Sequence, residues 1–303
     1  MQPTKQTADS SFWTQARCSQ ESLSLKPSLK ILLRRAAHQL SLLFRNHVAR
    51  EKKRNPDVTE REWEIYNTVK AGPLTMLSLE RILANIRAVG YVVSNRIPGD
   101  IVECGVWRGG SSMAMAMALL EYSDTSRTLW MYDTYAGMTE ATDVDMTHWG
   151  ANAADLLAAA KQHEAPEHSL VLARASLEDV TANMQSTGYP VGRINFVKGP
   201  VEQTIPGVMP DQIALLRIDT DWYESTRHEL RHLYPRLSPG GILIIDDYGH
   251  WQGARKAVDE YFKDAPLFLH RIDYTGRLAV KPTGHRLRTA DVSDAVAEQS
   301  LHS

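Results

Sequence analysis

The chain has 303 residues, of which 43% are hydrophobic and 23% charged, and its formal net charge at pH 7 is -2. This composition is typical of a globular protein with a sizeable core, and without a central basic stripe it predicts no nucleic-acid partner. No segment approaches the roughly 18 consecutive apolar residues of a membrane span, so none is expected. With only Cys18 and Cys104 present, neither a disulfide framework nor a cysteine zinc site is expected, and a cytoplasmic location is predicted.

Residues 1–57 differ from the rest of the chain and are predicted to form a basic N-terminal arm. In the segment KILLRRAAHQLSLLFRNHVAREKKRN, apolar residues such as Leu33, Leu40 and Leu43 recur at helical spacing among many Lys and Arg. Such a helix could bind a membrane surface or a partner, or act as a transit peptide, but a solvated or dimer-packing appendage is the favoured interpretation. A homo-oligomer is expected, with a dimer as the first candidate.

From Glu60 onward the pattern is helical, and residues 79–93 place apolar side chains on one face before a Pro-Gly stop. Strands and helices then alternate. The expected strands are residues 100–104, 128–132, 193–198, 213–218 and 241–245, and the expected helices are residues 110–122, 152–162, 177–186, 223–234 and 252–262. Strands separated by helices predict a parallel sheet. The closing segments PLFLHRID and RLAVKP are expected to form a hairpin at the sheet edge.

Three regions are therefore expected: the arm, a sheet domain over residues 58–282, and a polar tail over residues 283–303. In such a sheet, ligands bind at the carboxyl ends of the strands. The five predicted strands end, in order, at Glu103 with Gly105, Asp133, Gly199, Asp219 with Asp221, and Asp246 with Asp247. Crowded carboxylates repel one another unless a cation is present, so this edge is expected to bind positively charged ligands.

The turn after the first strand, GVWRGG, lacks the dinucleotide fingerprint, and Glu103 disfavours a pyrophosphate. A tight turn at a helix N-terminus still suits a ligand with a carboxylate or polar tail. Asp133 stands where an acid binds a ribose diol in nucleotide-binding folds, although for Asp133 alone a loop-capping role is favoured. Together these features predict S-adenosylmethionine, which carries a sulfonium, an ammonium, a carboxylate and a ribose.

The segments LLRIDTDWYEST and GGILIIDDYGH end in two acid pairs separated by one helix. If these strands are neighbours, three or four carboxylates converge, and a hard divalent ion, magnesium first, is the natural neutraliser. The alternative is that Asp221 and Asp247 cap the turns that follow them.

Aromatic residues in or near the strand-end loops could stack on an acceptor, and core packing explains any one of them equally well. They are Trp149, Tyr135, Trp222 and Trp251. The segment TEATDVDMTHWGANAADLL is long for a connection and is predicted to be a lid that excludes water. Its acids Asp143 and Asp145 are expected to be solvated.

The segments GDIVECGVWRGGSS, MYDTYAGM, LLRIDTDWYEST and GGILIIDDYGHWQGARKAVDEYF together resemble the macrocin-type sugar O-methyltransferases, which include mycinamicin, tylosin and novobiocin pathway enzymes. The resemblance covers about residues 60–282. It implies a Rossmann-like class I α/β fold with a mostly parallel seven-stranded sheet, helices on both faces, an antiparallel C-terminal hairpin strand and an N-terminal helical cap. It also implies O-methylation of a small-molecule hydroxyl, on a deoxysugar of a glycosylated natural product, with S-adenosylmethionine and Mg²⁺.

By the same resemblance, the metal ligands are Asp219, Asp246 and Asp247, and the general base is Asp221. The implied cofactor-binding residues are Thr75, Met76, Glu103, Cys104, Gly105, Val106, Trp107, Ser111, Asp133, Thr134, Gly137, Ser176 and Gly199. A carboxylate beside a cation has a low proton affinity, so Asp221 is expected to deprotonate only a hydroxyl that the metal has made more acidic. His250 is the alternative base because imidazole titrates near neutrality.

Two other functions stay open from the sequence. A glycosyltransferase could use the D-x-D motif to hold a metal-bound nucleotide sugar, but this leaves Glu103, Asp246 and Asp247 without a role. A non-catalytic binding protein on the same fold is the second alternative, and intact acids at both strand ends argue against it.

Overall fold

The structure is a computed structural model that describes residues 56–162 and 170–284. The chain divides into two compact units, Met1–Val58 and Thr59–Ser303. The sheet and helices given below belong to the second unit. The predicted basic arm and polar tail lie almost wholly outside the described residues.

Seven strands form one sheet in the order β3-β2-β1-β4-β5-β7-β6. They are β1 (Asp100–Cys104), β2 (Leu129–Asp133), β3 (Ile194–Lys198), β4 (Ile213–Ile218), β5 (Leu237–Ile245), β6 (His270–Arg271) and β7 (Arg277–Val280). The strands β1 to β5 pair in parallel, whereas β7 pairs antiparallel with both β5 and β6. The predicted parallel sheet with an antiparallel hairpin at its edge is confirmed.

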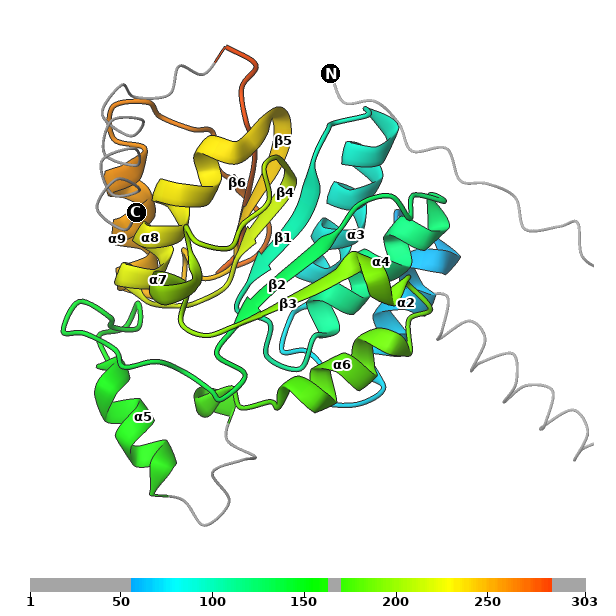
Figure 1. Ribbon diagram of the computed structural model, residues 1–303. Helices are drawn as coiled ribbons and strands as arrows, with labels where there is room; N and C mark the ends of the chain where they lie inside the picture. Colours follow the sequence, from blue (N-terminus) through cyan, green and yellow to red (C-terminus); the bar gives the residue numbers. More distant parts are fainter. Residues whose placement is uncertain (1–55, 163–169, 285–303) are drawn as a thin grey trace, which may run out of the picture. The chain divides into compact units, whose positions relative to one another are not determined.

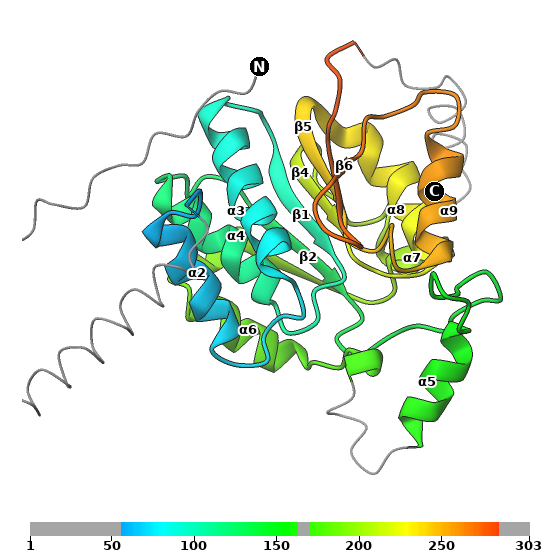
Figure 2. The ribbon, with the colours of Figure 1, turned by 180° about the vertical axis from the view of Figure 1, so that it is seen from behind.

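Helices cover both faces of the sheet, as predicted (Figures 1 and 2). One face carries α2 (Glu60–Lys70), α3 (Leu79–Ser94), α4 (Gly110–Glu121) and α6 (Leu177–Gln185), and the other carries α7 (Val201–Thr204), α8 (Tyr223–Leu233) and α9 (Gln252–Tyr261). Among the described α-helices, α5 (Ala153–Lys161) lies apart from both layers. Its segment connects β2 to α6.

The central strands read as continuous apolar runs because both of their faces are buried. In β5, Ile242 and Ile244 pack in the cluster with α2, α3 and α4, whereas Leu243 and Ile245 pack in the cluster with α8 and α9. Each such buried side chain stabilises the fold by about 1.5–3 kcal/mol. Alternate side chains of β5 therefore pack against the helices on opposite faces of the sheet.

Two features of the fold differ from the sequence prediction. The four-residue helix α7 was not expected, because a single turn carries no periodic signal. The strand β5 begins at Leu237 rather than residue 241, although Pro239 and two glycines read as a turn. The register between β4 and β5 shifts at this point, and Gly240 adopts a φ of 79°. An irregularity absorbs the extra residues without ending the strand.

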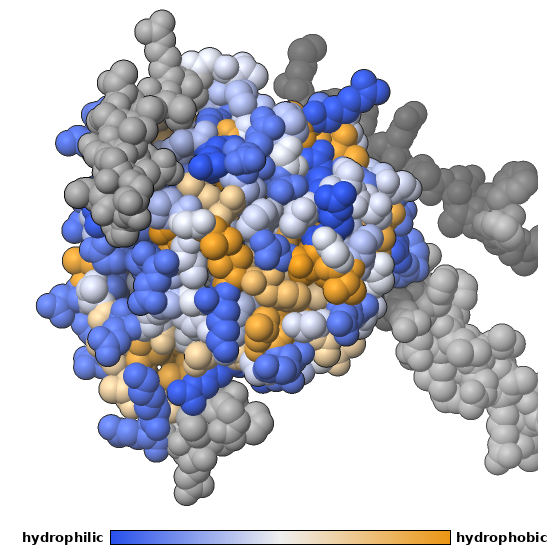
Figure 3. Space-filling model, viewed as in Figure 1, coloured by the Kyte–Doolittle hydropathy of each residue, from blue (hydrophilic) through white to orange (hydrophobic). Residues whose placement is uncertain are grey.

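None of the helices in the described ranges is long and apolar enough to cross a membrane. On the side seen in Figure 1, apolar residues gather in the middle of the surface and hydrophilic residues border them (Figure 3).

Candidate active site

The carboxyl ends of β1, β4 and β5 meet where the strand order changes direction. Cys104 is in register with Ile218, and Ile218 with Ile245. The amide of Asp219 donates to the Cys104 carbonyl, and the amide of Asp246 donates to the Ile218 carbonyl, each over 2.9 Å. The expectation that the two acid-bearing strands are neighbours is confirmed. Ligands bind at such switch points in α/β sheets.

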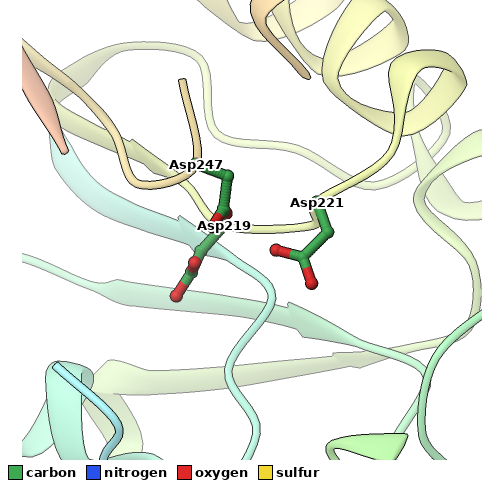
Figure 4. Close-up of side chains that lie close together, drawn as sticks. All are labelled: Asp219, Asp221 and Asp247. Carbon is green, nitrogen blue, oxygen red and sulfur yellow. The ribbon is translucent and has the colours of Figure 1, made fainter. Parts of the chain in front are cut away.

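Three carboxylates converge at this edge: those of Asp219, Asp221 and Asp247. One oxygen from each lies within 4.8 Å of those of the other two. Figure 4 shows the Asp221 carboxylate pointing toward the other two. Asp221 has a φ of 69°, in the left-handed region that costs a non-glycine residue about 1–2 kcal/mol. This backbone conformation turns the chain between β4 and α8 at the cluster.

Burial raises the pKa of all three carboxyls, because the charged form loses solvation. It raises the pKa of Asp221 to about 7, and the charges of Asp219 and Asp246 add to this effect. The pKa values of Asp219 and Asp247 are also raised, first by burial and then by neighbouring carboxylates. The cluster therefore favours either bound protons or a bound cation.

Arg217, the last residue but one of β4, supplies one permanent positive charge. Its side chain is 0% exposed. Its guanidinium lies 2.7 Å from Asp219, 2.5 Å from Asp246 and 3.5 Å from Glu103. Arg217 had no predicted role, although an arginine inside the apolar run LLRI is an unusual residue for a buried strand.

Arg81, in the first turn of α3, supplies a second positive charge. It forms ion pairs with Asp246 and, over 3.0 Å, with Asp273. Each carboxylate oxygen of Asp246 thus has an arginine partner. Of the three predicted metal ligands, Asp219 and Asp247 lie in the cluster, whereas Asp246 is held by Arg217 and Arg81.

Five carboxyl groups at the ends of β1, β4 and β5 have two guanidinium groups as counter-charges in the described part of the chain. The carboxylates belong to Glu103, Asp219, Asp221, Asp246 and Asp247. Asp247 also has a buried oxygen without a hydrogen-bond partner among the described residues. Buried charges need partners, so a further cation fits this site.

The turn after β1 approaches the main chain of β4 closely. Gly105 has a φ of 82°, and a Cβ atom there would lie 1.9 Å from the carbonyl oxygen of Asp219. The carboxylate of Asp133 accepts hydrogen bonds from the amides of Val106 and Trp107, over 2.7 and 2.9 Å. Asp133 therefore orders the turn that precedes α4.

Many of the predicted cofactor-binding residues line one cavity beside this turn. They are Met76, Gly105, Trp107, Asp133, Thr134, Gly137 and Gly199. Asp219 and Asp221 line the same cavity. Glu103 and Cys104 are buried beneath the cavity-lining residues, at 2% and 0% exposure. Glu103 accepts a hydrogen bond from Ser112.

A second cavity opens on the other side of the cluster. Its lining includes Thr75, Val106, Ser111, Asp246, Asp247, His250 and Trp251. The two cavities share Met76, Trp107, Ala173, Asp219 and Asp221. The predicted cofactor-binding residue Ser176 lines neither cavity. It caps α6 by accepting a hydrogen bond from the Asp179 amide, and it borders a separate cavity. The acid cluster thus lies where the two cavities meet.

Aromatic rings line the second cavity. Trp149 is 65% exposed, and its ring lies 5.3 Å from that of His250. His250 is also close to Tyr274, with 3.3 Å between Nδ1 and the hydroxyl oxygen. Burial and the nearby His148 and Arg81 lower the pKa of His250. Tyr135 and Trp222, which were also predicted to stack on the acceptor, do not line this cavity and are buried in hydrophobic core clusters.

The long segment after β2 contains one acid that was wrongly expected to be solvated. Asp143 is exposed as expected, but Asp145 is 0% exposed. Its carboxylate accepts hydrogen bonds from the amides of Tyr223 and Thr142 and from the Thr142 hydroxyl. The prediction was wrong because the Tyr223 amide, the partner of Asp145 on α8, is 78 residues away in the sequence.

Comparison with known proteins gives consistent matches over this domain. The family model described as macrocin-O-methyltransferase (TylF) matches residues 18–279. The 8-demethyl-8-(2,3-dimethoxy-alpha-L-rhamnosyl)-tetracenomycin-C 4'-O-methyltransferase of Streptomyces olivaceus is 40% identical over 187 residues, which are 62% of this chain and 67% of that protein. The demethyldecarbamoylnovobiocin O-methyltransferase of Streptomyces niveus is 34% identical over 74% of this chain and 78% of its own. The solved structure of the O-methyltransferase NovP is 33% identical, covers 75% of this chain and 90% of its own, and has a TM-score of 0.58.

Proposed function

Because the chain belongs to the macrocin O-methyltransferase (TylF) family and is a methyltransferase, we propose that it methylates a sugar hydroxyl of a glycosylated natural product. S-adenosylmethionine is the proposed methyl donor. A divalent ion is proposed to bind the acid cluster, with Mg²⁺ as the first candidate. The observation that carries the proposal is the position of Asp219, Asp221 and Asp247 at the junction of two cavities.

The first cavity fits the proposed cofactor. Its wall is the Gly105 turn, where main chain rather than side chain approaches a ligand. The ribose role proposed for Asp133 must share the carboxylate with the amides of Val106 and Trp107. An excess of carboxylates at the shared wall favours a sulfonium.

The acid cluster fits a hard divalent ion. Carboxylate oxygens are the ligands that Mg²⁺ prefers, and Asp247 offers a buried oxygen that has no other partner in the described part of the chain. Asp219, Asp221 and Asp247 would hold the ion in this arrangement, and Asp246 would join them only by leaving an arginine. When bound, S-adenosylmethionine supplies the methyl group, and the ion supplies positive charge that stabilises an acceptor oxygen.

The protein's own groups supply alignment and a proton acceptor. The second cavity orients the acceptor toward the wall that it shares with the first, so that the acceptor oxygen faces the methyl group. Asp221 is the proposed proton acceptor. Without an ion, burial raises its pKa to about 7, and a bound cation would lower the pKa again, so Asp221 would deprotonate only a hydroxyl that the ion has made more acidic. The ion pair with the buried Arg217 guanidinium fixes the position of the Asp219 carboxylate.

A sugar acceptor is proposed from two sources. The Streptomyces olivaceus relative is named for a rhamnosyl-tetracenomycin. In this chain, the exposed rings of Trp149 and Tyr274 border the second cavity, and flat rings of this kind bind the apolar faces of sugars. The glycosyltransferase alternative is not favoured, because the named relatives are O-methyltransferases.

Calorimetric titration with S-adenosylmethionine, with and without Mg²⁺, tests the cofactor and metal together. We expect binding of S-adenosylmethionine and transfer of its methyl group to a rhamnosyl glycoside. The variant Asp247→Asn should lose Mg²⁺ binding and turnover but retain cofactor binding. Binding of a nucleoside diphosphate sugar without binding of S-adenosylmethionine would overturn the proposal.

A further inference from the structure

Asp145 connects two parts of the site that are distant in the sequence. One carboxylate oxygen, Oδ1, accepts a hydrogen bond from the Tyr223 amide over 2.8 Å. The other, Oδ2, accepts two bonds from Thr142, from its amide over 2.8 Å and its hydroxyl over 2.7 Å. Asp145 is fully buried and lines neither of the two cavities. Any role in the reaction must therefore act through its neighbours.

Asp145 lies at the N-termini of the two helices that follow the acid pairs. Tyr223 is the first residue of α8, and the N-cap residue Trp222 provides no side-chain cap. Asp145 supplies that cap instead, which a helix N-terminus favours because its free amides carry partial positive charge. A Cβ atom on Gly253, in the first turn of α9, would lie 2.0 Å from Oδ1 of Asp145. The carboxylate thus occupies the space between α8 and α9.

The chain around Asp145 contacts the same two loops. The indole of Trp222 donates to the Thr139 carbonyl over 3.3 Å. The amide of Gln252 donates to the Met146 carbonyl, and its side-chain amide donates to the Thr147 carbonyl, each over 2.8 Å. Segment 139–147 is therefore attached both beside Asp221 and beside the loop after Asp247.

A short hairpin follows Asp145 directly. Met146 and Asn152 form an antiparallel bridge, and Trp149 lies between them, exposed and on the wall of the second cavity. The base of this hairpin is Asp145, whose carbonyl also accepts the Ala153 amide over 2.9 Å. Asp145 thus holds the hairpin and the Asp221 loop in one fixed relation.

We infer that Asp145 is a positioning residue: it clamps hairpin 146–152 to the start of α8, so that Trp149 and Asp221 face the acceptor together. The role in catalysis builds on the proposed function, whereas the clamp itself does not. A misplacement of about 1 Å can lower the rate by about 100-fold, which is the effect expected when such a clamp is lost.

The clamp is tested on the full-length protein without any substrate. Chymotrypsin cleavage after Trp149 is followed by mass spectrometry in wild type, Asp145→Ala, Asp145→Asn and Thr142→Val. Cleavage should be about tenfold faster in Asp145→Ala, because proteolysis follows the population of the opened hairpin. Asp145→Asn keeps an acceptor oxygen, so its cleavage rate should lie between those of wild type and Asp145→Ala. Thr142→Val removes only the hydroxyl bond to Oδ2, so its cleavage rate should resemble that of wild type. Equal cleavage rates in Asp145→Ala and wild type would overturn the clamp.

The catalytic part is tested by kinetics on the same variants. The kcat/KM for the glycoside should fall about 100-fold in Asp145→Ala, with little change in the dissociation constant of S-adenosylmethionine, and Asp145→Asn should recover most of the loss. Gly253→Ala keeps the carboxylate but displaces it, and should resemble Asp145→Ala. Equal losses of acceptor efficiency and cofactor affinity would mean a merely structural role. Absence of transfer by wild type would overturn the proposed function, while the cleavage result would still decide the clamp.

Discussion

The guanidinium of Arg217 lies 2.7 Å from a carboxylate oxygen of Asp219, and the arginine side chain has no solvent exposure. Burial alone would lower the pKa of Arg217, but the carboxylates of Asp219, Asp246 and Glu103 outweigh it and raise the pKa. Arg217 is therefore a fixed positive charge beneath the acid cluster.

Arg217→Met should lower the free energy of unfolding by about 3–5 kcal/mol, because it leaves buried carboxylates without a counter-charge. Urea denaturation measures the change. The control is Arg227→Met, which removes a surface ion pair with Glu224 and should cost less than about 1 kcal/mol. Equal stability losses in the two variants would contradict a special role for Arg217.

Gly105→Ala should destabilise the protein and weaken cofactor binding. The new Cβ would strain a left-handed residue and meet the Asp219 carbonyl, at a cost of roughly 2–5 kcal/mol. Gly188 has a similar φ of 78° but open space around it, so Gly188→Ala should cost only about 1–2 kcal/mol. Urea denaturation and calorimetry with S-adenosylmethionine compare the two. Identical behaviour would show that the close approach to β4 is unimportant.

Asp221→Asn should lower kcat by about 10²–10⁴-fold, the usual contribution of a general base. His250→Gln should have a smaller effect, since His250 lines the second cavity but lies outside the carboxylate cluster. Single-turnover methyl transfer on both variants separates the two candidate bases. A larger loss in His250→Gln than in Asp221→Asn would assign the proton transfer to the histidine.

Metal binding should strengthen as the pH rises through about 7. Burial raises the pKa of Asp221 from 3.8 to about 7, so the folded chain binds this proton more tightly than the unfolded chain. Without metal, this group therefore lowers the stability as the pH rises from 3.8 to about 7. A divalent ion needs the deprotonated form, so binding should release protons and oppose that loss.

Scanning calorimetry with and without Mg²⁺ at pH 5.5 and pH 8 checks this expectation. The rise in Tm on adding Mg²⁺ should be larger at the higher pH. Asp221→Asn should reduce the difference between the two pH values. An equal rise in Tm at both pH values would argue that the cluster does not bind the ion.

The alternation of strands and helices was predicted well because each element carries its own periodic signal. The predicted ends of three strands, Cys104, Ile218 and Ile245, coincide with the observed ends of β1, β4 and β5, whose apolar runs are buried on both faces. Adjacent acid pairs on β4 and β5 then followed from parallel topology. The boundary of β5 was missed because Pro239 and Gly240 look like a turn unless the neighbouring strand is known.

The sequence by itself determined the family, the parallel sheet and the acids at its carboxyl edge, because these depend on local periodicity and short motifs. Only the tertiary structure decided that Asp246 pairs with two arginines and that Asp145 is buried against α8. Those contacts join residues 165, 29 and 78 positions apart. Whether a charged side chain meets water or a buried partner depends on which distant segments pack beside it, and no local pattern carries that information.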